Sequence, residues 1–252
     1  MSPYILSLII AVVVNIIFFL IANSKKTDKF TDLSYGLTFI LIAFITLIFN
    51  RIAYGKIILF FMIFVWAMRL ILYLTERIAK IKKDSRFDNI RNNPKKFIRF
   101  FLGQSIIAWI IMIPAIIYLS SDQLAFNIIT ILGFIIWLIG LIIEAKADEQ
   151  KYKHKNRTKD KWITTGLWKY SRHPNYFGEI LCWVGIYIFV LGSVSLTKAL
   201  IGLVSPILII ALLLFVTGIP KLELSYNRRY GADPEYKKYK RTTNLLIPWF
   251  KK

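Results

Sequence analysis

The chain has 252 residues, of which 56% are hydrophobic and 15% aromatic, and its net charge is +20. This apolar content is too high for a soluble domain with one ordinary core, so we expect a membrane protein. The single Cys182 excludes an internal disulfide, and with only two histidines beside it the usual zinc sites are excluded as well. The sequence also lacks the phosphate-binding loop, the Gly-rich dinucleotide turn, and the HExxH and GxSxG motifs.

Seven apolar stretches are long enough to cross a bilayer as helices, which takes about 20 residues each. The first has neither a basic leader nor a cleavage site and is interpreted as a permanent span. The sixth is short and the seventh contains Gly202 and Pro206, so a tilted or re-entrant pair is an alternative there. The sequence predicts an all-α, polytopic bundle with spans at residues 3–23, 33–50, 55–76, 97–119, 125–145, 178–194 and 197–219.

Basic residues gather in every second loop of this arrangement. Because cytoplasmic loops carry the excess of Lys and Arg, the pattern predicts the N-terminus outside and the C-terminus in the cytoplasm. Orientation and contact with anionic lipid account for most of the +20, so the expected partners are membrane lipids and not nucleic acid. We expect a single membrane domain over residues 1–252. Thirty of the 34 Lys and Arg residues lie in the segments 24–32, 77–99, 146–172 and 221–252.

The segment 166–179 is the richest in groups able to bind or react. It turns at Pro174 into an apolar helix, on which Asn175 and Glu179 share a face because they are four residues apart. An aromatic belt at the membrane interface would explain Trp168 and the neighbouring tyrosines, but it needs neither an amide nor a carboxylate at a helix start. We therefore favour a binding site. Its polar members are Arg172, His173, Asn175, Tyr176 and Glu179.

Two further clusters flank this segment in the sequence. The fifth helix continues beyond the membrane with Lys151 and Lys155 one turn apart, a spacing that suits a phosphate or pyrophosphate. A solvated basic helix end is an equally good interpretation. After the seventh span, Glu223, Tyr226 and Tyr230 fall on one helical stripe that either contacts a nucleotide or packs the following segment onto the bundle.

Ionisable groups also occur within or at the ends of the spans. Arg69 lies about two turns from Arg77, and an ion at that depth costs about 2.5–3.5 kcal/mol on insertion scales. It is expected to have a partner, to snorkel or to line a polar cavity. Asp32 and Tyr35 lie one turn apart at the start of the second span, which suits an acid pair for proton transfer, while Asp32 alone suits a helix cap.

The chain resembles the C-terminal half of the steroid 5-alpha-reductase superfamily, specifically its bacterial branch of uncharacterised, DUF1295-like membrane proteins. The resemblance covers roughly residues 30–250 and is most specific over 140–250. The RHPNY element at 172–176 also occurs in sterol C14 reductases and isoprenylcysteine carboxyl methyltransferases, so it indicates the fold and a nucleotide-like cofactor more firmly than the reaction. The segments that carry the resemblance are 166–179, 218–231 and 240–249.

The resemblance implies a helical bundle in a bacterial cytoplasmic membrane. Residues 140–252 of this bundle would enclose NADPH. Residues 31–139, which follow a span and loop at 1–30, would admit a hydrophobic substrate from the bilayer. Such a reductase receives hydride from its cofactor, polarises the substrate carbonyl and supplies a proton. With the polar members of the segment 166–179 included, the expected cofactor contacts are Lys151, Lys155, Trp168, Arg172, His173, Asn175, Tyr176, Glu179, Glu223, Tyr226, Arg229, Tyr230 and Tyr239.

On the substrate side the chain departs from the steroid enzymes. Aligning Arg69 with their arginine places Trp66 where their substrate tyrosine stands, and Tyr73 completes the expected pocket. An indole does not donate a proton as a phenol does. Asp32 and Tyr35 are therefore expected to form the catalytic acid element, and no metal is expected.

The sequence thus favours an NADPH-dependent reductase of a carbon–carbon double bond in a steroid-, isoprenoid- or lipid-like substrate. The main alternative is an S-adenosylmethionine-dependent methyltransferase of the isoprenylcysteine type. Those enzymes usually carry adjacent glutamates before the YG-like element, whereas Glu223 stands between Leu222 and Leu224. A non-enzymatic, lipid-binding membrane protein is the third possibility, because topology alone would explain its charge.

Overall fold

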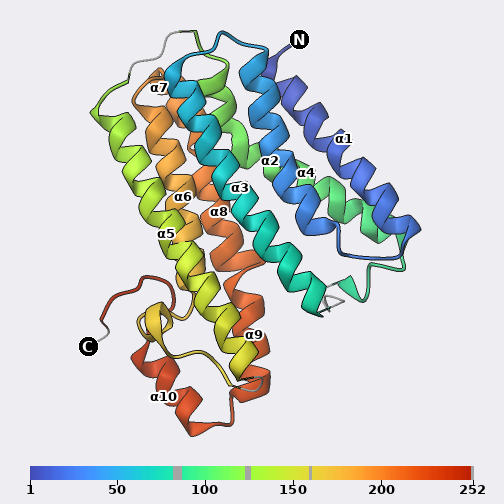
Figure 1. Ribbon diagram of the computed structural model, residues 1–252, viewed down its shortest axis with the longest axis vertical. Coiled ribbons are helices and arrows are strands. Elements are labelled where there is room, and N and C mark those ends of the chain that lie inside the picture. The colour runs from blue at the N-terminus through green and yellow to red at the C-terminus, as the bar shows by residue number, and fades with distance from the viewer. Residues whose placement is uncertain (82–86, 123–125, 159–160, 251–252) are drawn as a thin grey trace. The chain divides into compact units, whose positions relative to one another are not determined.

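The described part of the chain is built mainly from helices (Figure 1). The computed structural model describes residues 1–81, 87–122, 126–158 and 161–250. Over these residues there are no strands, and seven helices are long and apolar enough to cross a membrane. The protein is therefore an integral membrane protein in contact with lipid, and the predicted all-α fold with seven spans is confirmed.

The helices reproduce the predicted spans with shifted ends. The predicted start of the fifth span, at residue 125, lies outside the described residues. The first helices are α1 (Pro3–Ser24), α2 (Thr31–Ile48), α3 (Tyr54–Ile81) and α4 (Pro94–Leu119). They are followed by α5 (Ile128–Arg157), a 3₁₀ turn (Gly166–Lys169), α6 (Pro174–Leu191), α7 (Leu196–Gly202), α8 (Val204–Ala211), a π-helical turn (Leu212–Val216), α9 (Ile219–Tyr230) and α10 (Pro234–Thr242).

The seventh predicted span is broken into shorter helical pieces. α7 ends at Gly202, and Leu203 separates it from α8. Pro206 explains the break, because it has no N–H to donate to the carbonyl of residue 202 and its ring crowds that carbonyl. Gly218 separates the π-helical turn from α9, and a Cβ there would lie 2.6 Å from the carbonyl oxygen of Leu213. A side chain at residue 218 would therefore not fit.

The chain forms two compact units. The first unit comprises Met1–Ile131 and Ile186–Ser205, and the second comprises Leu132–Gly185 and Pro206–Lys252. Both contain parts of the membrane-spanning helices. All the expected cofactor contacts belong to the second unit. The expected catalytic and substrate-pocket residues belong to the first unit, and these are Asp32, Tyr35, Trp66, Arg69 and Tyr73.

In the first unit, buried and half-buried polar side chains join α1, α2 and α4. The Gln104 amide Nε2 donates to Asn15 Oδ1 at 2.9 Å and to Ser34 Oγ at 2.8 Å. Asn15 Nδ2 in turn donates to Thr38 Oγ1 at 3.0 Å. Because an unsatisfied polar group is costly in hydrocarbon, this network fixes how the three helices face one another.

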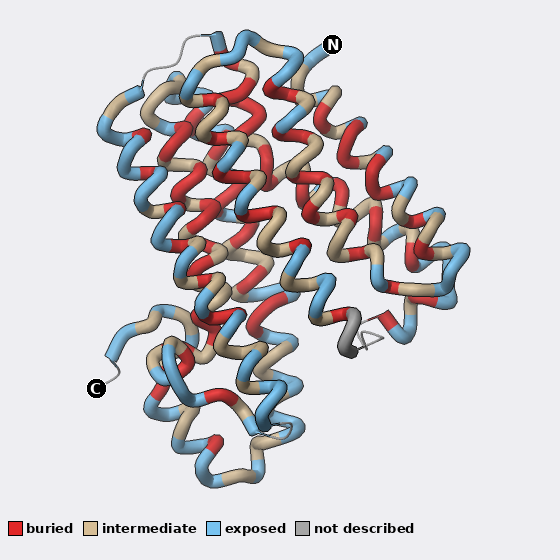
Figure 2. Tube along the Cα trace, in the orientation of Figure 1, coloured by how far each residue is buried: buried red, intermediate tan, exposed pale blue. Residues whose placement is uncertain are grey.

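In the second unit, α5 and α6 pack with their backbones in direct contact. A Cβ on Gly140 would lie 2.7 Å from the Cys182 amide nitrogen, and one on Gly178 would lie 2.6 Å from the Glu144 amide nitrogen. Small residues at such positions allow membrane helices to approach closely. Exposed positions recur along α5, which begins in the first unit and continues in the second (Figure 2). The exposed residues between Ile128 and Ile142 are mainly large and apolar, as expected for contact with lipid.

Candidate functional site

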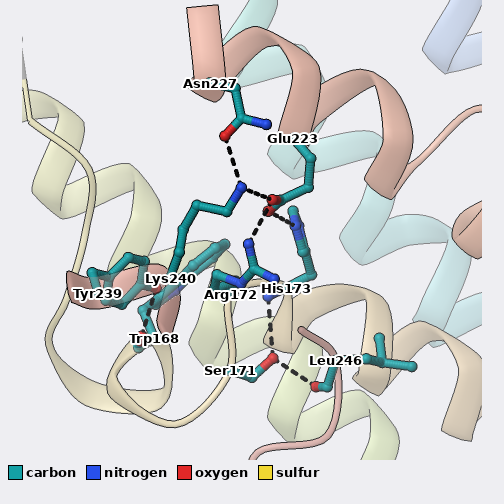
Figure 3. Close-up of polar contacts among 9 residues, drawn as sticks. All are labelled: Trp168, Ser171, Arg172, His173, Glu223, Asn227, Tyr239, Lys240 and Leu246. Atoms are coloured by element: carbon teal, nitrogen blue, oxygen red, sulfur yellow. Dashed lines mark hydrogen bonds and ion pairs between the residues drawn. The ribbon is translucent and has the colours of Figure 1, made fainter. Parts of the chain in front are cut away.

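Three basic side chains of the second unit converge on one carboxylate (Figure 3). Oε2 of Glu223, on α9, accepts from Arg172 Nη1 at 2.5 Å and lies 3.2 Å from Lys240 Nζ. Its other oxygen, Oε1, lies 3.0 Å from His173 Nε2. The Glu223 side chain is only 16% exposed. The carboxylate therefore joins α9, α10 and the loop before α6 into one ionic cluster, which we call the Glu223 cluster.

The loop before α6 holds two members of this cluster in place. Proline disfavours helical backbone in the residue before it and suits the first position of a helix, so the chain turns at His173 and α6 begins at Pro174. Ser171 Oγ accepts from the backbone N–H of His173 at 3.1 Å and donates to the carbonyl of Leu246 at 2.6 Å. The Arg172 N–H donates to the carbonyl of Asn244 at 2.9 Å. The segment after α10 thus supports this loop.

The His173 imidazole is uncharged at neutral pH. Its side chain is 1% exposed, and burial lowers its pKa more than the neighbouring carboxylate raises it. A neutral imidazole has one N–H, and Glu223 Oε1 requires that proton to be on Nε2. Nδ1 is then the acceptor nitrogen. The ring also stacks on Tyr176, with centroids 5.8 Å apart and an interplanar angle of 11°.

Aromatic side chains from the 161–170 segment, α9 and α10 enclose the Glu223 cluster. The Trp162 ring lies 5.1 Å from the Tyr236 ring and 5.3 Å from the Tyr230 ring. Tyr226 and Tyr230 are stacked with centroids 6.0 Å apart, as their shared helical stripe predicts. Burial raises the pKa of Tyr236 to about 12 and also raises the pKa of Tyr239, so both phenols stay protonated at neutral pH.

Trp168 is a buried structural residue of this wall. It is 2% exposed, and its indole N–H donates to the Ala147 carbonyl at 3.0 Å. Its own carbonyl accepts from the Tyr239 hydroxyl at 2.8 Å, and Lys151 Nζ lies over its ring at 5.1 Å. A residue packed in this way does not belong to a lipid-facing aromatic belt. Lys155, one turn further along α5, is exposed.

The donors of the cluster suit an anionic, aromatic ligand, but the enclosed space is small. Within the described residues, Arg172 Nε and Trp162 Nε1 are buried without a hydrogen-bond partner. Both side chains line a cavity of about 20 Å³, together with Glu223, Tyr226 and other aromatic residues. That volume holds about one water. A dinucleotide therefore fits the chemistry of these residues only if part of it lies outside the cavity or the aromatic wall opens.

Two open depressions on α9 and α10 offer outside surface, and one of them adjoins the cluster. One, of about 250 Å³, lies between the end of α9 and α10 and shares Tyr236 with the small cavity. Its cations include Lys240, which reaches from the depression to Glu223. The other, of about 340 Å³, lies on the exposed face of α9. The cations that line the two depressions are Lys237, Lys240 and Arg241 in the first and Lys221, Arg228 and Arg229 in the second.

The remaining expected contacts in the second unit lie on α6 and α9. Asn175, Tyr176 and Glu179 are half-buried in the first two turns of α6. The guanidinium of Arg229 lies over the Tyr230 ring at 5.3 Å. The expected contacts of the second unit thus come from α5, the 3₁₀ turn, the loop before α6, α6 itself, α9 and α10.

In the first unit, the structure brings Tyr35 and Trp66 together through one shared aromatic neighbour. The Phe39 ring lies edge-on to Tyr35 at 4.9 Å and to Trp66 at 5.3 Å, and Trp66 is fully buried. Arg69 and Tyr73 follow on α3 and are half-buried.

The helix-cap interpretation of Asp32 is wrong. α2 begins one residue earlier, at Thr31, and its N-cap position is Phe30. Asp32 therefore lies in the first turn, where a carboxylate is stabilised by the helix dipole. The Thr31 hydroxyl donates to the Asp28 carbonyl at 2.8 Å and so helps to fix this helix start.

Three residues in or next to the cluster were not predicted as site residues from the sequence. Ser171, Trp162 and Lys240 owe their positions to the path of the chain after α9, which returns beside residues 162–173. The sequence did contain a partial indication for Lys240. Tyr239 and Lys240 follow Tyr236 by three and four residues, so the three side chains share one face of a short helix. Over the described residues, no three His, Cys, Asp or Glu side chains lie close enough to hold a metal ion.

Comparison with known proteins gives a family and no named relative. No curated protein and no solved structure matches the chain. The family model described as "Protein of unknown function (DUF1295)" matches residues 18–243, which is most of the sequence and includes the whole Glu223 cluster and its aromatic wall. The chain therefore belongs to the DUF1295 family.

Proposed function

We propose that the second unit binds NADPH and that the protein is an NADPH-dependent reductase of a carbon–carbon double bond in a hydrophobic substrate. The observation that carries the proposal is the Glu223 cluster with its aromatic wall and two unsatisfied buried donors, beside a cation-lined depression between α9 and α10. The three segments that resemble the steroid 5-alpha-reductase superfamily meet at this cluster. Membership of that superfamily is part of the proposal.

The charge of the depressions favours a phosphate-rich ligand over S-adenosylmethionine. Each depression is lined by three cations and by no carboxylate. NADPH carries a pyrophosphate and a 2′-phosphate, which Lys and Arg bind by charge-assisted hydrogen bonds. S-adenosylmethionine carries a sulfonium and an ammonium group against a single carboxylate, so its net charge is positive and such a surface would repel it. The same surface therefore supports the reductase more strongly than the methyltransferase.

Within the second unit, different residues would bind the phosphate groups and the rings of the cofactor. Lys237, Lys240 and Arg241 would hold the phosphate groups, and the rings of Trp162 and Tyr226 would flank the base or the nicotinamide. Bound NADPH would supply hydride to the substrate double bond. Glu223 keeps Arg172 and Lys240 in fixed positions, because it pairs with both.

The substrate side belongs to the first unit. Trp66, Arg69 and Tyr73 would contact the hydrophobic substrate, and Asp32 with Tyr35 would supply the proton. The distribution of basic residues favours an orientation with the second unit's loops in the cytoplasm, and in a bacterial cytoplasmic membrane NADPH would be available to them there.

Binding of NADPH, NADH and S-adenosylmethionine to the detergent-purified protein tests this proposal. We expect NADPH to bind most tightly, because only NADPH carries the 2′-phosphate. Replacing Asn175 with alanine should weaken NADPH binding about tenfold, the usual effect of losing one good hydrogen bond. The matched control is Asn156→Ala, since Asn156 is exposed near the end of α5 and should tolerate the change. A preference for S-adenosylmethionine would indicate a methyltransferase, and no binding of any nucleotide would indicate a lipid-binding protein.

A further inference from the structure

We propose that the segment 244–250 is a membrane anchor, with Ile247, Trp249 and Phe250 inserted into the lipid interface beside the start of α6. These side chains are 57%, 71% and 73% exposed, and they follow one another on a short stretch of irregular backbone. Large apolar side chains gathered in this way are costly in water, whereas tryptophan and neighbouring aromatic rings are typical of the membrane interface. This inference does not depend on the identity of the cofactor.

The length of α6 places this segment at the membrane surface. α6 has 18 residues, which rise about 27 Å at 1.5 Å per residue, while the hydrocarbon layer is about 30 Å thick. The whole helix is needed to cross, so its first residue, Pro174, must lie at the interface. The segment 244–250 is attached directly before that residue: Ser171 pairs with Asn244 as an isolated β-bridge, and Ser171 Oγ donates to the Leu246 carbonyl at 2.6 Å.

The exposed rings are presented by ordered backbone. Asn244 Nδ2 donates to the Trp249 carbonyl at 2.7 Å, and the Trp249 N–H donates to the Ile247 carbonyl at 2.9 Å. The Phe250 ring packs edge-on against Tyr170 at 5.1 Å. Because the segment is already fixed, little conformational entropy is lost when its apolar side chains enter the interface.

A lysine lies beside the aromatic rings of this segment, as is typical of residues at the level of lipid headgroups. Lys169 Nζ lies over the Tyr170 ring at 5.7 Å, so a basic group stands beside the aromatic pair formed by Tyr170 and Phe250. Lysine beside interfacial aromatics is favourable because the ring sits at headgroup level while the ammonium reaches lipid phosphate. The same segment supports the loop that carries Arg172 and His173, so anchoring it would hold that loop against the membrane.

Fluorescence quenching of the full-length protein in phosphatidylcholine vesicles tests the anchor. The contribution of Trp249 is obtained by subtracting the Trp249→Phe variant, a conservative change at an exposed ring, after circular dichroism has shown matched helix content. We expect this contribution to be blue-shifted, quenched by lipids brominated near the headgroup, and protected from aqueous iodide. The matched control adds Lys238→Trp to that variant, because residue 238 is exposed on α10 and its indole should be quenched by iodide.

Two results would overturn the anchor. Quenching of Trp249 by iodide, to the same extent as the control indole and without quenching by brominated lipid, would show that the segment faces water. Protection from both quenchers would show that protein covers it, for example a second copy of this chain. The other tryptophans do not affect this result, because they are present in both samples and their signal cancels in the subtraction.

Discussion

Replacing Glu223 with glutamine should destabilise the protein by about 3 kcal/mol, because a mostly buried carboxylate is removed from two cations that then lack a counter-charge. The same change should weaken NADPH binding at least tenfold, since Arg172 and Lys240 lose the group that positions them. The measurements are thermal unfolding and NADPH titration of the purified protein in one detergent.

A matched glutamate on α5 controls for the loss of an ion pair as such. Glu149 pairs with Lys153 one helical turn away, and both side chains are exposed. Such a surface pair contributes about 0–1 kcal/mol, so Glu149→Gln should leave both unfolding and NADPH binding almost unchanged. Equal effects of the two substitutions would contradict the role assigned to Glu223.

Replacing Gly178 with alanine should destabilise the protein by about 3 kcal/mol, at the upper end of the usual cost of overpacking. The added methyl group would lie 2.6 Å from the Glu144 amide nitrogen and 2.7 Å from the Gly140 carbonyl oxygen, and neither backbone atom is able to turn aside as a flexible side chain does. α5 and α6 would have to separate. The midpoint of thermal unfolding measures the effect.

Gly103 on α4 provides the matched control for this substitution. A Cβ there meets no atom within 4 Å, so only helix propensity changes, and alanine should stabilise the helix by about 0.5–1 kcal/mol. If Gly178→Ala were tolerated as well as Gly103→Ala, the direct backbone contact between α5 and α6 would be wrong.

The membrane helices were predictable because their signal is local. A run of about 20 apolar residues must form a helix in hydrocarbon, where every backbone polar group needs an internal partner. The exact ends and breaks of the helices were not predicted, because they depend on single residues. Pro206 breaks the last span at Leu203, and α2 begins at Thr31, so Asp32 is not its cap.

The candidate site was predictable wherever its residues share one helix. Helical spacing correctly groups Glu223, Tyr226 and Tyr230 on one side of α9. Lys240 and Trp162 were not predicted as site residues, because their contacts depend on how the chain returns after α9. The burial of Trp168 was also hidden, since a tryptophan near a membrane interface suits a lipid-facing belt and a buried wall equally well.

Hydrogen–deuterium exchange with and without saturating NADPH tests most directly the claim that the Glu223 cluster holds the cofactor. We predict slower exchange of backbone amides in residues 162–175 and 223–244 on addition of NADPH, with little change in α1. Unchanged exchange in both segments at saturating NADPH, or protection confined to the first unit, would contradict the claim.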